Sequence, residues 1–107
     1  MAQIPNTTQN TDTRPLTPEI LTEQGWKIDE ETSFYSCLLK DLDEVYCNED
    51  DFTAYMMIKF GKKRDYVRFD IERDLGDSIR TNFKRKITVE EFNTLLDIVK
   101  LEKYKIK

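Results

Sequence analysis

The stretch from Phe52 to Arg73, FTAYMMIKFGKKRDYVRFDIER, decides the fold, because apolar residues recur at every second position in both of its halves. Alternation with a period of two places the apolar residues on one face of a strand and the intervening residues on the other. The stretch therefore predicts a β-hairpin with one apolar face. The residues expected on that inner face are Phe52, Ala54, Met56, Ile58, Phe60, Val67, Phe69 and Ile71.

The length of the hairpin loop follows from the phase of the two strands. The apolar residues have even numbers before the turn and odd numbers after it, so the loop must contain an even number of residues. Lys63-Arg64 is poorly suited to a two-residue turn, which needs residues that accept positive φ. We therefore predict a four-residue loop, Lys62 to Asp65, closed by Gly61 opposite Tyr66.

The chain before the hairpin begins with a polar segment and a short helix. Residues 1–15 have almost no apolar content and are expected to form a disordered tail, followed by a single domain over residues 16–107. Thr17 is a predicted N-cap with Pro18 at the first helical position. Gly25 is expected to end this helix in a left-handed conformation, which returns Trp26 to the core.

Residues 26–48 alternate less clearly. Residues 26–28 are expected to begin a short strand, 29–33 to form a turn, and 34–40 and 45–48 to form two further strands. Tyr35, Cys37 and Leu39 fall on one face and Phe34 and Leu38 on the other. This region is either buried on both faces or different in phase from this assignment.

The chain after the hairpin predicts a third strand and a closing helix. Alternation continues through Ile79, Thr81, Phe83 and Ile87, with Arg80, Asn82, Lys84 and Lys86 on the opposite face. Thr88 and Glu91 have the spacing of a capping box. The helix that follows is expected to bury Phe92, Leu95, Leu96 and Val99 and to end near Leu101, with Tyr104 and Ile106 in a last extended segment.

Together these elements predict an α+β fold. We expect an antiparallel meander of four to five strands, with a short N-terminal helix and a C-terminal helix packed on one face of the sheet.

Charge is divided unevenly along the chain, although its net value is only −4. Residues 1–57 contain 12 acidic and 3 basic residues, and residues 58–107 contain 9 acidic and 14 basic residues. This asymmetry indicates either a charged partner or self-association, or two halves that neutralise each other in the fold. We expect a monomer or weak homodimer.

The sequence predicts a cytoplasmic protein without a membrane span or cofactor. It has no long apolar run and no histidine, and its three glycines are isolated, which removes the usual zinc ligand sets and phosphate loops. Acidic residues between Asp41 and Asp51 do not have the spacing of a calcium loop, so no metal site is expected. Cys37 and Cys47 are interpreted as reduced thiols rather than a disulfide. We expect no enzymatic activity and no catalytic residues.

The outer face of the hairpin and its loop form the predicted binding site for an unidentified protein partner. Aromatic, methionine and basic side chains gather there: Tyr55, Met57, Lys59, Lys62, Lys63, Arg64, Tyr66 and Arg68. The alternative hypothesis is single-stranded nucleic-acid binding, since aromatic residues among bases on a sheet face can stack and neutralise a nucleic acid. That alternative adds Arg80, Lys84 and Lys86. Asp70 and Glu72 share the face and could instead pair with its bases.

The segments LTPEIL…GWK (residues 16–27), FY at 34–35 and TVEEFNTLL (88–96) resemble short uncharacterised proteins encoded by phages, prophages and mobile elements of gut anaerobic bacteria. Such proteins often open with Leu-Thr and a short helix that ends in Gly plus an aromatic residue. The closing helix here lacks the His-Leu-Gln start that is common among them. The resemblance implies a small accessory protein that acts by contact.

Overall fold

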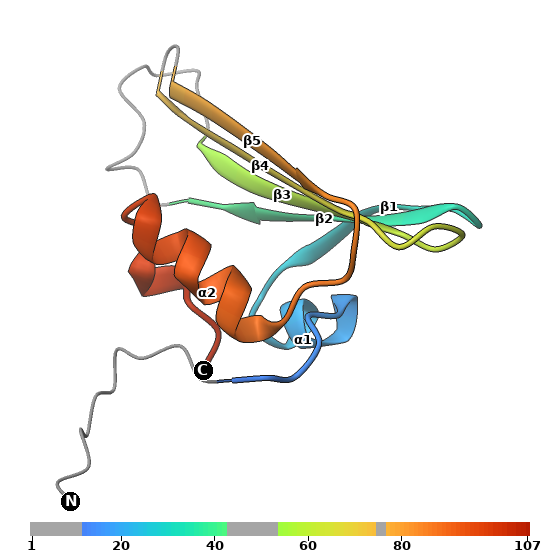
Figure 1. The fold of residues 1–107 in the computed structure, drawn as a ribbon. Helices are drawn as coiled ribbons and strands as arrows, with labels where there is room; N and C mark the ends of the chain where they lie inside the picture. Colours follow the sequence, from blue (N-terminus) through green and yellow to red (C-terminus); the bar gives the residue numbers. More distant parts are fainter. Residues whose placement is uncertain (1–11, 43–53, 75–76) are drawn as a thin grey trace, which may run out of the picture. The chain divides into compact units, whose positions relative to one another are not determined.

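The computed structural model describes residues 12–42, 54–74 and 77–107. These residues divide into two compact units, one within residues 17–86 and the other formed by residues 12–16 with 87–107. The first unit contains a five-stranded sheet and helix α1, and the second contains helix α2 and the 3-10 turn η2 (Figure 1). The predicted α+β class with an N-terminal and a C-terminal helix is confirmed.

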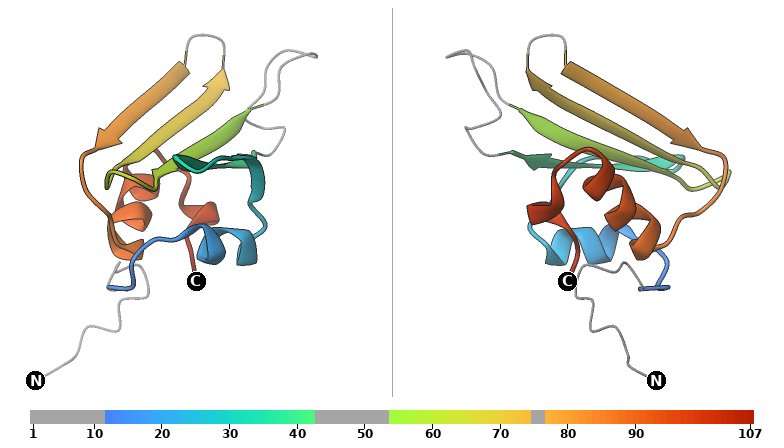
Figure 2. Two further views of the ribbon diagram at one scale, coloured as in Figure 1. Left: turned by 90° about the vertical axis from the view of Figure 1, so that its right-hand side faces the viewer. Right: turned by 60° about the vertical axis from the view of Figure 1, so that its left-hand side comes forward.

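The sheet is an antiparallel meander in the order β1-β2-β3-β4-β5, as the two views in Figure 2 show. Sequential strands pair throughout, so every connection joins neighbouring strands. The strands are β1 (Lys27–Glu31), β2 (Tyr35–Asp41), β3 (Tyr55–Gly61), β4 (Val67–Asp74) and β5 (Asp77–Phe83).

The central hairpin has the predicted register and loop. Phe60 lies opposite Val67, and the Gly61 N–H donates to the Tyr66 carbonyl at 3.0 Å, which closes the loop of residues 62–65. On the inner face, Leu38, Ile58 and Phe69 lie side by side across β2, β3 and β4 and are at most 2% exposed. The predicted alternation therefore becomes a buried apolar row across the sheet. Phe52 lies outside the described residues.

Helix α1 (Pro18–Glu23) begins and ends as the sequence predicts. The Thr17 side chain accepts from the Ile20 N–H at 3.2 Å, and Gly25 has φ of 93°. That turn lets the Trp26 N–H donate to the Leu21 carbonyl at 3.0 Å, and the Trp26 side chain is 4% exposed. The assignment of Trp26 to the core is confirmed.

Two strand boundaries differ from the sequence prediction. The expected turn over residues 29–33 is wrong, because β1 continues to Glu31 through a register shift between Ile28 and Glu30. This extra residue interrupts the simple alternation that marks a strand in the sequence. The third strand was expected to reach Ile87 but ends at Phe83, so Lys84 and Lys86 follow the strand rather than lie on its face. The expected strand at 45–48, and with it Cys47, lies outside the described residues.

In the second unit, α2 (Val89–Ile98) begins at the predicted capping box. The Thr88 N–H donates to Glu91 Oε1 at 2.9 Å, and the Glu91 N–H donates to Thr88 Oγ1 at 3.2 Å. The helix ends at Ile98, earlier than predicted. Of its expected apolar stripe, Phe92 and Leu96 are fully buried, whereas Leu95 and Val99 are half-buried.

The segment after α2 also departs from expectation. Tyr104 belongs to η2 (Glu102–Tyr104) and not to an extended segment, because the chain turns again directly after the helix.

At the other end of this unit, residues 12–16 run beside the start of α2. The carbonyls of Arg14 and Asp12 accept from the Val89 and Glu90 N–H groups, each at 2.8 Å. The first amides of the helix are therefore satisfied by backbone from the N-terminal segment. Residues 1–11 of the expected tail lie outside the described part.

Candidate functional site

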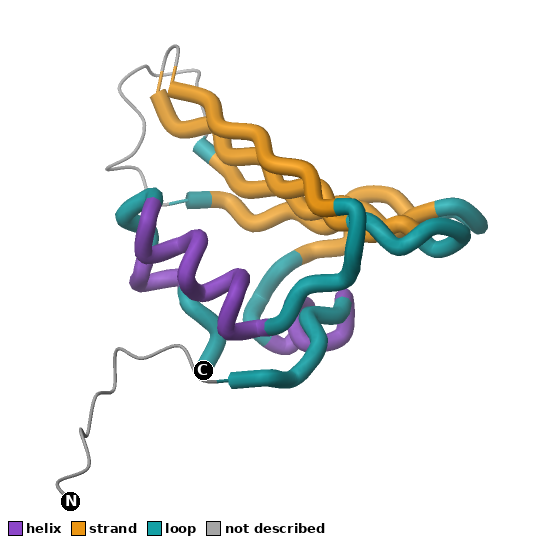
Figure 3. Tube along the Cα trace, viewed as in Figure 1, coloured by secondary structure: helices purple, strands orange, loops and turns teal. Residues whose placement is uncertain are grey.

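The predicted binding residues occupy two adjoining parts of the first unit. The outer face is the sheet surface opposite the buried row, and it carries Tyr55, Met57 and Lys59 of β3 and Arg68 of β4. The loop end consists of residues 32–34 between β1 and β2 and residues 62–66 between β3 and β4. Both turns appear as teal loops at the same end of the sheet in Figure 3.

A half-exposed apolar pair lies near the middle of the outer face. Met57 is opposite Leu39 in the register of β2 and β3, and both side chains are half-buried. Tyr55 lies two residues along β3 on the same face and is also half-buried, and burial raises the pKa of its hydroxyl, with a further contribution from Glu72. The outer face thus offers an apolar and aromatic centre. Sequence reasoning did not include Leu39, because the strand that contains it alternates poorly.

Several cations of the outer face are already engaged by neighbouring side chains. Lys59 Nζ lies 4.3 Å from the centre of the Tyr35 ring. Asp70, only 6% exposed, accepts from Arg68 Nε at 3.1 Å and from Arg80 Nε at 2.9 Å. These contacts hold three cations of the face, and the two guanidinium groups share a single carboxylate. The expected pairing of its bases with Asp70 is confirmed.

Tyr35 connects the outer face to the loop end. Its hydroxyl donates to Glu30 Oε1 at 2.7 Å, and that hydrogen bond is the main reason why the pKa of Tyr35 is raised. Across the sheet, Tyr35 lies opposite Gly61. A Cβ atom at Gly61 would overlap with the Tyr66 ring, so this ring lies directly over the glycine. Tyr35 was not among the predicted site residues, although its position on the face of Cys37 and Leu39 could have indicated it.

Cys37 lies on the outer face but is shielded from solvent. It is opposite Lys59, is a free cysteine and is 3% exposed. Burial is the largest cause that raises the pKa of its thiol, followed by the charge of Asp29. The neutral thiol is therefore favoured, which is the state of an unreactive structural cysteine.

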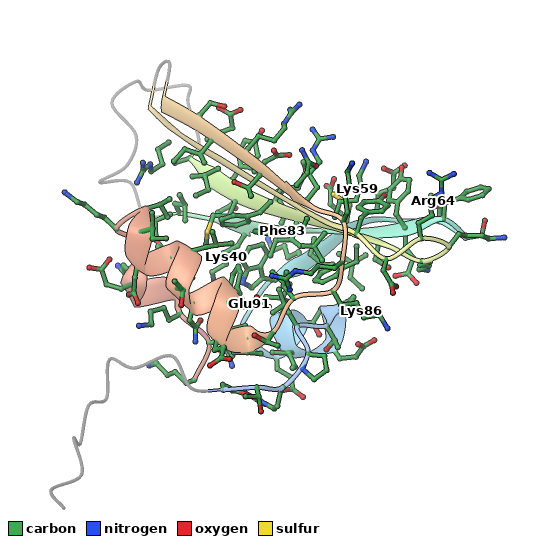
Figure 4. All side chains as sticks on the ribbon, viewed as in Figure 1. Lys40, Lys59, Arg64, Phe83, Lys86 and Glu91 are labelled. Carbon is green, nitrogen blue, oxygen red and sulfur yellow. The ribbon has the colours of Figure 1, made fainter. Side chains whose placement is uncertain are left out.

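A direct backbone hydrogen bond joins the two turns of the loop end. The Lys62 N–H donates to the Phe34 carbonyl at 2.8 Å, and Lys62 Nζ contacts Glu31 Oε2 at 3.1 Å. Lys63 and Arg64 are exposed and make no ion pair with a described residue; Figure 4 shows Arg64 at the tip and Lys59 on the sheet. The loop end also exposes Phe34, which was not among the predicted site residues.

The residues of the nucleic-acid alternative are less concentrated. Arg80 lies on the outer face of β5 and donates to Asp70, whereas Lys84 and Lys86 are exposed in the segment after the strand. The structure thus does not place these three residues together on one strand face.

Among the described residues, no cluster of three histidine, cysteine, aspartate or glutamate side chains is arranged to hold a metal ion. Within the same residues, no helix combines the length and apolar content needed to cross a membrane. No family model, curated protein or solved structure matches this chain.

Proposed function

We propose that this chain is a small, non-enzymatic, cytoplasmic protein that acts by binding another protein. The observation that carries the proposal is the half-exposed pair of Met57 and Leu39 on the outer face, beside Tyr55. Tyrosine, methionine and arginine are enriched at protein interfaces, where an apolar centre is surrounded by a polar rim. Here the apolar centre has a rim of charged groups such as the half-buried Lys59 and Arg68.

The electrostatics of the outer face also favour a protein partner over nucleic acid. Two of its cations, Arg68 and Arg80, share the carboxylate of Asp70. A nucleic-acid surface gains most of its affinity from cations that neutralise phosphates, so cations already paired in the fold contribute less. Single-stranded nucleic-acid binding through Arg80, Lys84 and Lys86 therefore remains the alternative and not the proposal.

The proposal is tested with the purified, tagged full chain as bait in lysate of the organism that carries the gene. Met57→Lys is expected to abolish retention of a discrete protein, because it places a charge at the centre of the contact. Lysine at this position faces Asp70 across the strands, which limits its cost to the fold. Thermal unfolding of both proteins establishes that the variant is folded.

Ile98→Lys is the matched control, since Ile98 is a 70% exposed apolar residue on α2, outside the proposed surface. It should retain the partner as the parent chain does. Equal retention by the Met57 and Ile98 variants would contradict the proposed surface. Nuclease treatment of half of each sample identifies the alternative, because a nucleic-acid partner would be lost from the treated half.

A further inference from the structure

The loop end presents an aromatic side chain from a firmly held backbone. Phe34 is 62% exposed, the largest exposed aromatic fraction among the residues that the structure describes. Its N–H donates to Thr32 Oγ1 at 3.0 Å, and its carbonyl accepts from the Lys62 N–H at 2.8 Å. Thr32 also donates its own N–H to the Tyr35 carbonyl at 2.8 Å, which closes the turn. Both backbone polar groups of Phe34 are therefore satisfied while its ring faces solvent.

This arrangement has the physical properties of a binding anchor. An aromatic ring that is exposed in the free protein gains the most from burial in a partner's pocket. A backbone fixed before binding loses little conformational entropy when the complex forms. Residues of this kind, placed in pockets, carry a large share of the binding energy at protein interfaces.

The charges around the ring indicate the chemistry of the pocket. Lys63 Nζ lies 5.4 Å from the centre of the Phe34 ring, and Arg64 is exposed beside it in the loop. Lys62 is engaged by Glu31, so the charge that the loop end offers to a partner comes from Lys63 and Arg64, opposed only by Asp65. Carboxylates are the complementary groups.

We propose that Phe34 is the anchor of the interface, and that it inserts into an apolar pocket of a partner protein whose rim carries carboxylates facing Lys63 and Arg64. This inference rests on the proposed protein-binding function and names the chemistry of the partner's site. A nucleic-acid partner is one of the outcomes that the test below distinguishes.

The test places the photoreactive residue p-benzoylphenylalanine at position 34 in one sample of the full chain and at position 57 in another. Each is irradiated in lysate of the organism that carries the gene, and the cross-linked peptides are identified by mass spectrometry. We expect position 34 to cross-link to a protein segment that lines an apolar pocket and includes or adjoins aspartate or glutamate. With the purified partner, Phe34→Ala should weaken binding by about tenfold or more.

Charge reversal tests the proposed rim. Lys63→Glu with Arg64→Glu should weaken binding by a similar factor and leave thermal unfolding unchanged. Lys84→Glu with Lys86→Glu makes the same change of charge at two exposed lysines outside the loop end, and it should bind like the parent chain. Equal effects of the two double variants would overturn the inference about carboxylates.

The two cross-linking positions separate failure of this inference from failure of the proposed function. Cross-links from position 57 without any from position 34 would overturn the anchor while supporting a protein partner at the outer face. An absence of protein cross-links from both positions would overturn both proposals. Cross-links that disappear after nuclease treatment would overturn the protein pocket in favour of nucleic acid.

Discussion

The side-chain amide of Asn93 forms a pair of hydrogen bonds with the backbone of Ile106, 13 residues along the chain. Its Nδ2 donates to the Ile106 carbonyl at 3.1 Å, and the Ile106 N–H donates to Oδ1 at 2.9 Å. Asn93 is 5% exposed and Ile106 is 6% exposed. The buried amide thus makes the two backbone hydrogen bonds that a neighbouring strand would otherwise make, and it holds the C-terminal segment beside α2.

Asn93→Ala is expected to lower the free energy of unfolding by about 2–3 kcal/mol, because it leaves a buried N–H and a buried carbonyl without partners. Chemical denaturation followed by circular dichroism measures this change. Thr94→Ala, one residue further along the helix at an exposed position, serves as the control and should cost much less. Equal losses for the two variants would contradict the role assigned to Asn93.

At the end of α2, Lys100 has a left-handed backbone conformation, which is strained for a residue other than glycine. This residue has φ of 63°, while the Leu101 N–H donates to the Leu96 carbonyl at 2.8 Å and the Lys100 N–H to the Asp97 carbonyl at 3.2 Å. These bonds form a Schellman motif, in which glycine is the preferred residue at the left-handed position. Lys100→Gly should raise the free energy of unfolding by roughly 0.5–1 kcal/mol. Lys103→Gly, within the 3-10 turn, should lower it, and a melting temperature that rises in both variants would argue against this explanation.

Position 61 requires glycine, because neighbouring atoms of the hairpin loop leave no room for a Cβ atom. A Cβ atom there would overlap with the Tyr66 ring and with the Arg64 carbonyl oxygen. Gly61→Ala should therefore destabilise the protein by about 1–3 kcal/mol, as overpacking does elsewhere. Because the ring is one of the two obstacles, adding Tyr66→Ala should cost less in the Gly61→Ala background than in the parent chain. Strict additivity in thermal or denaturant unfolding would contradict the predicted contact.

Tyr35 should make stability depend on pH in the alkaline range. Its hydrogen bond to Glu30 raises its pKa above the ordinary value of 10.0, so folding favours the neutral phenol. This contribution is fully present below the unfolded pKa and is lost as pH rises through the folded pKa. The difference in tyrosinate absorbance between the parent chain and Tyr35→Phe isolates this group among the five tyrosines. Glu30→Gln should lower the midpoint of that difference; an unchanged midpoint would exclude Glu30 as the cause.

Local patterns in the sequence determined much of the fold. Strict alternation around Gly61 specified the register of the central hairpin, since a shift by one residue would expose its whole apolar face. The caps at Thr17 and Thr88 were equally clear, because a cap uses side chains within one helical turn of the residues that they satisfy. The packing of the C-terminal helix on the sheet stays a prediction.

Other features required the tertiary structure. The bulge after Ile28 breaks the period that marks a strand, so the sequence could not place the end of β1. In the sequence, nothing distinguishes Phe34 from an apolar residue of the core. Its exposure follows from the turn at Thr32 and from the backbone hydrogen bond to Lys62, 28 residues away. The hydrogen bonds of Asn93 to Ile106 likewise join distant positions. Periodicity and capping are local and therefore visible in sequence, whereas the environment of a side chain depends on which distant segments the fold brings beside it.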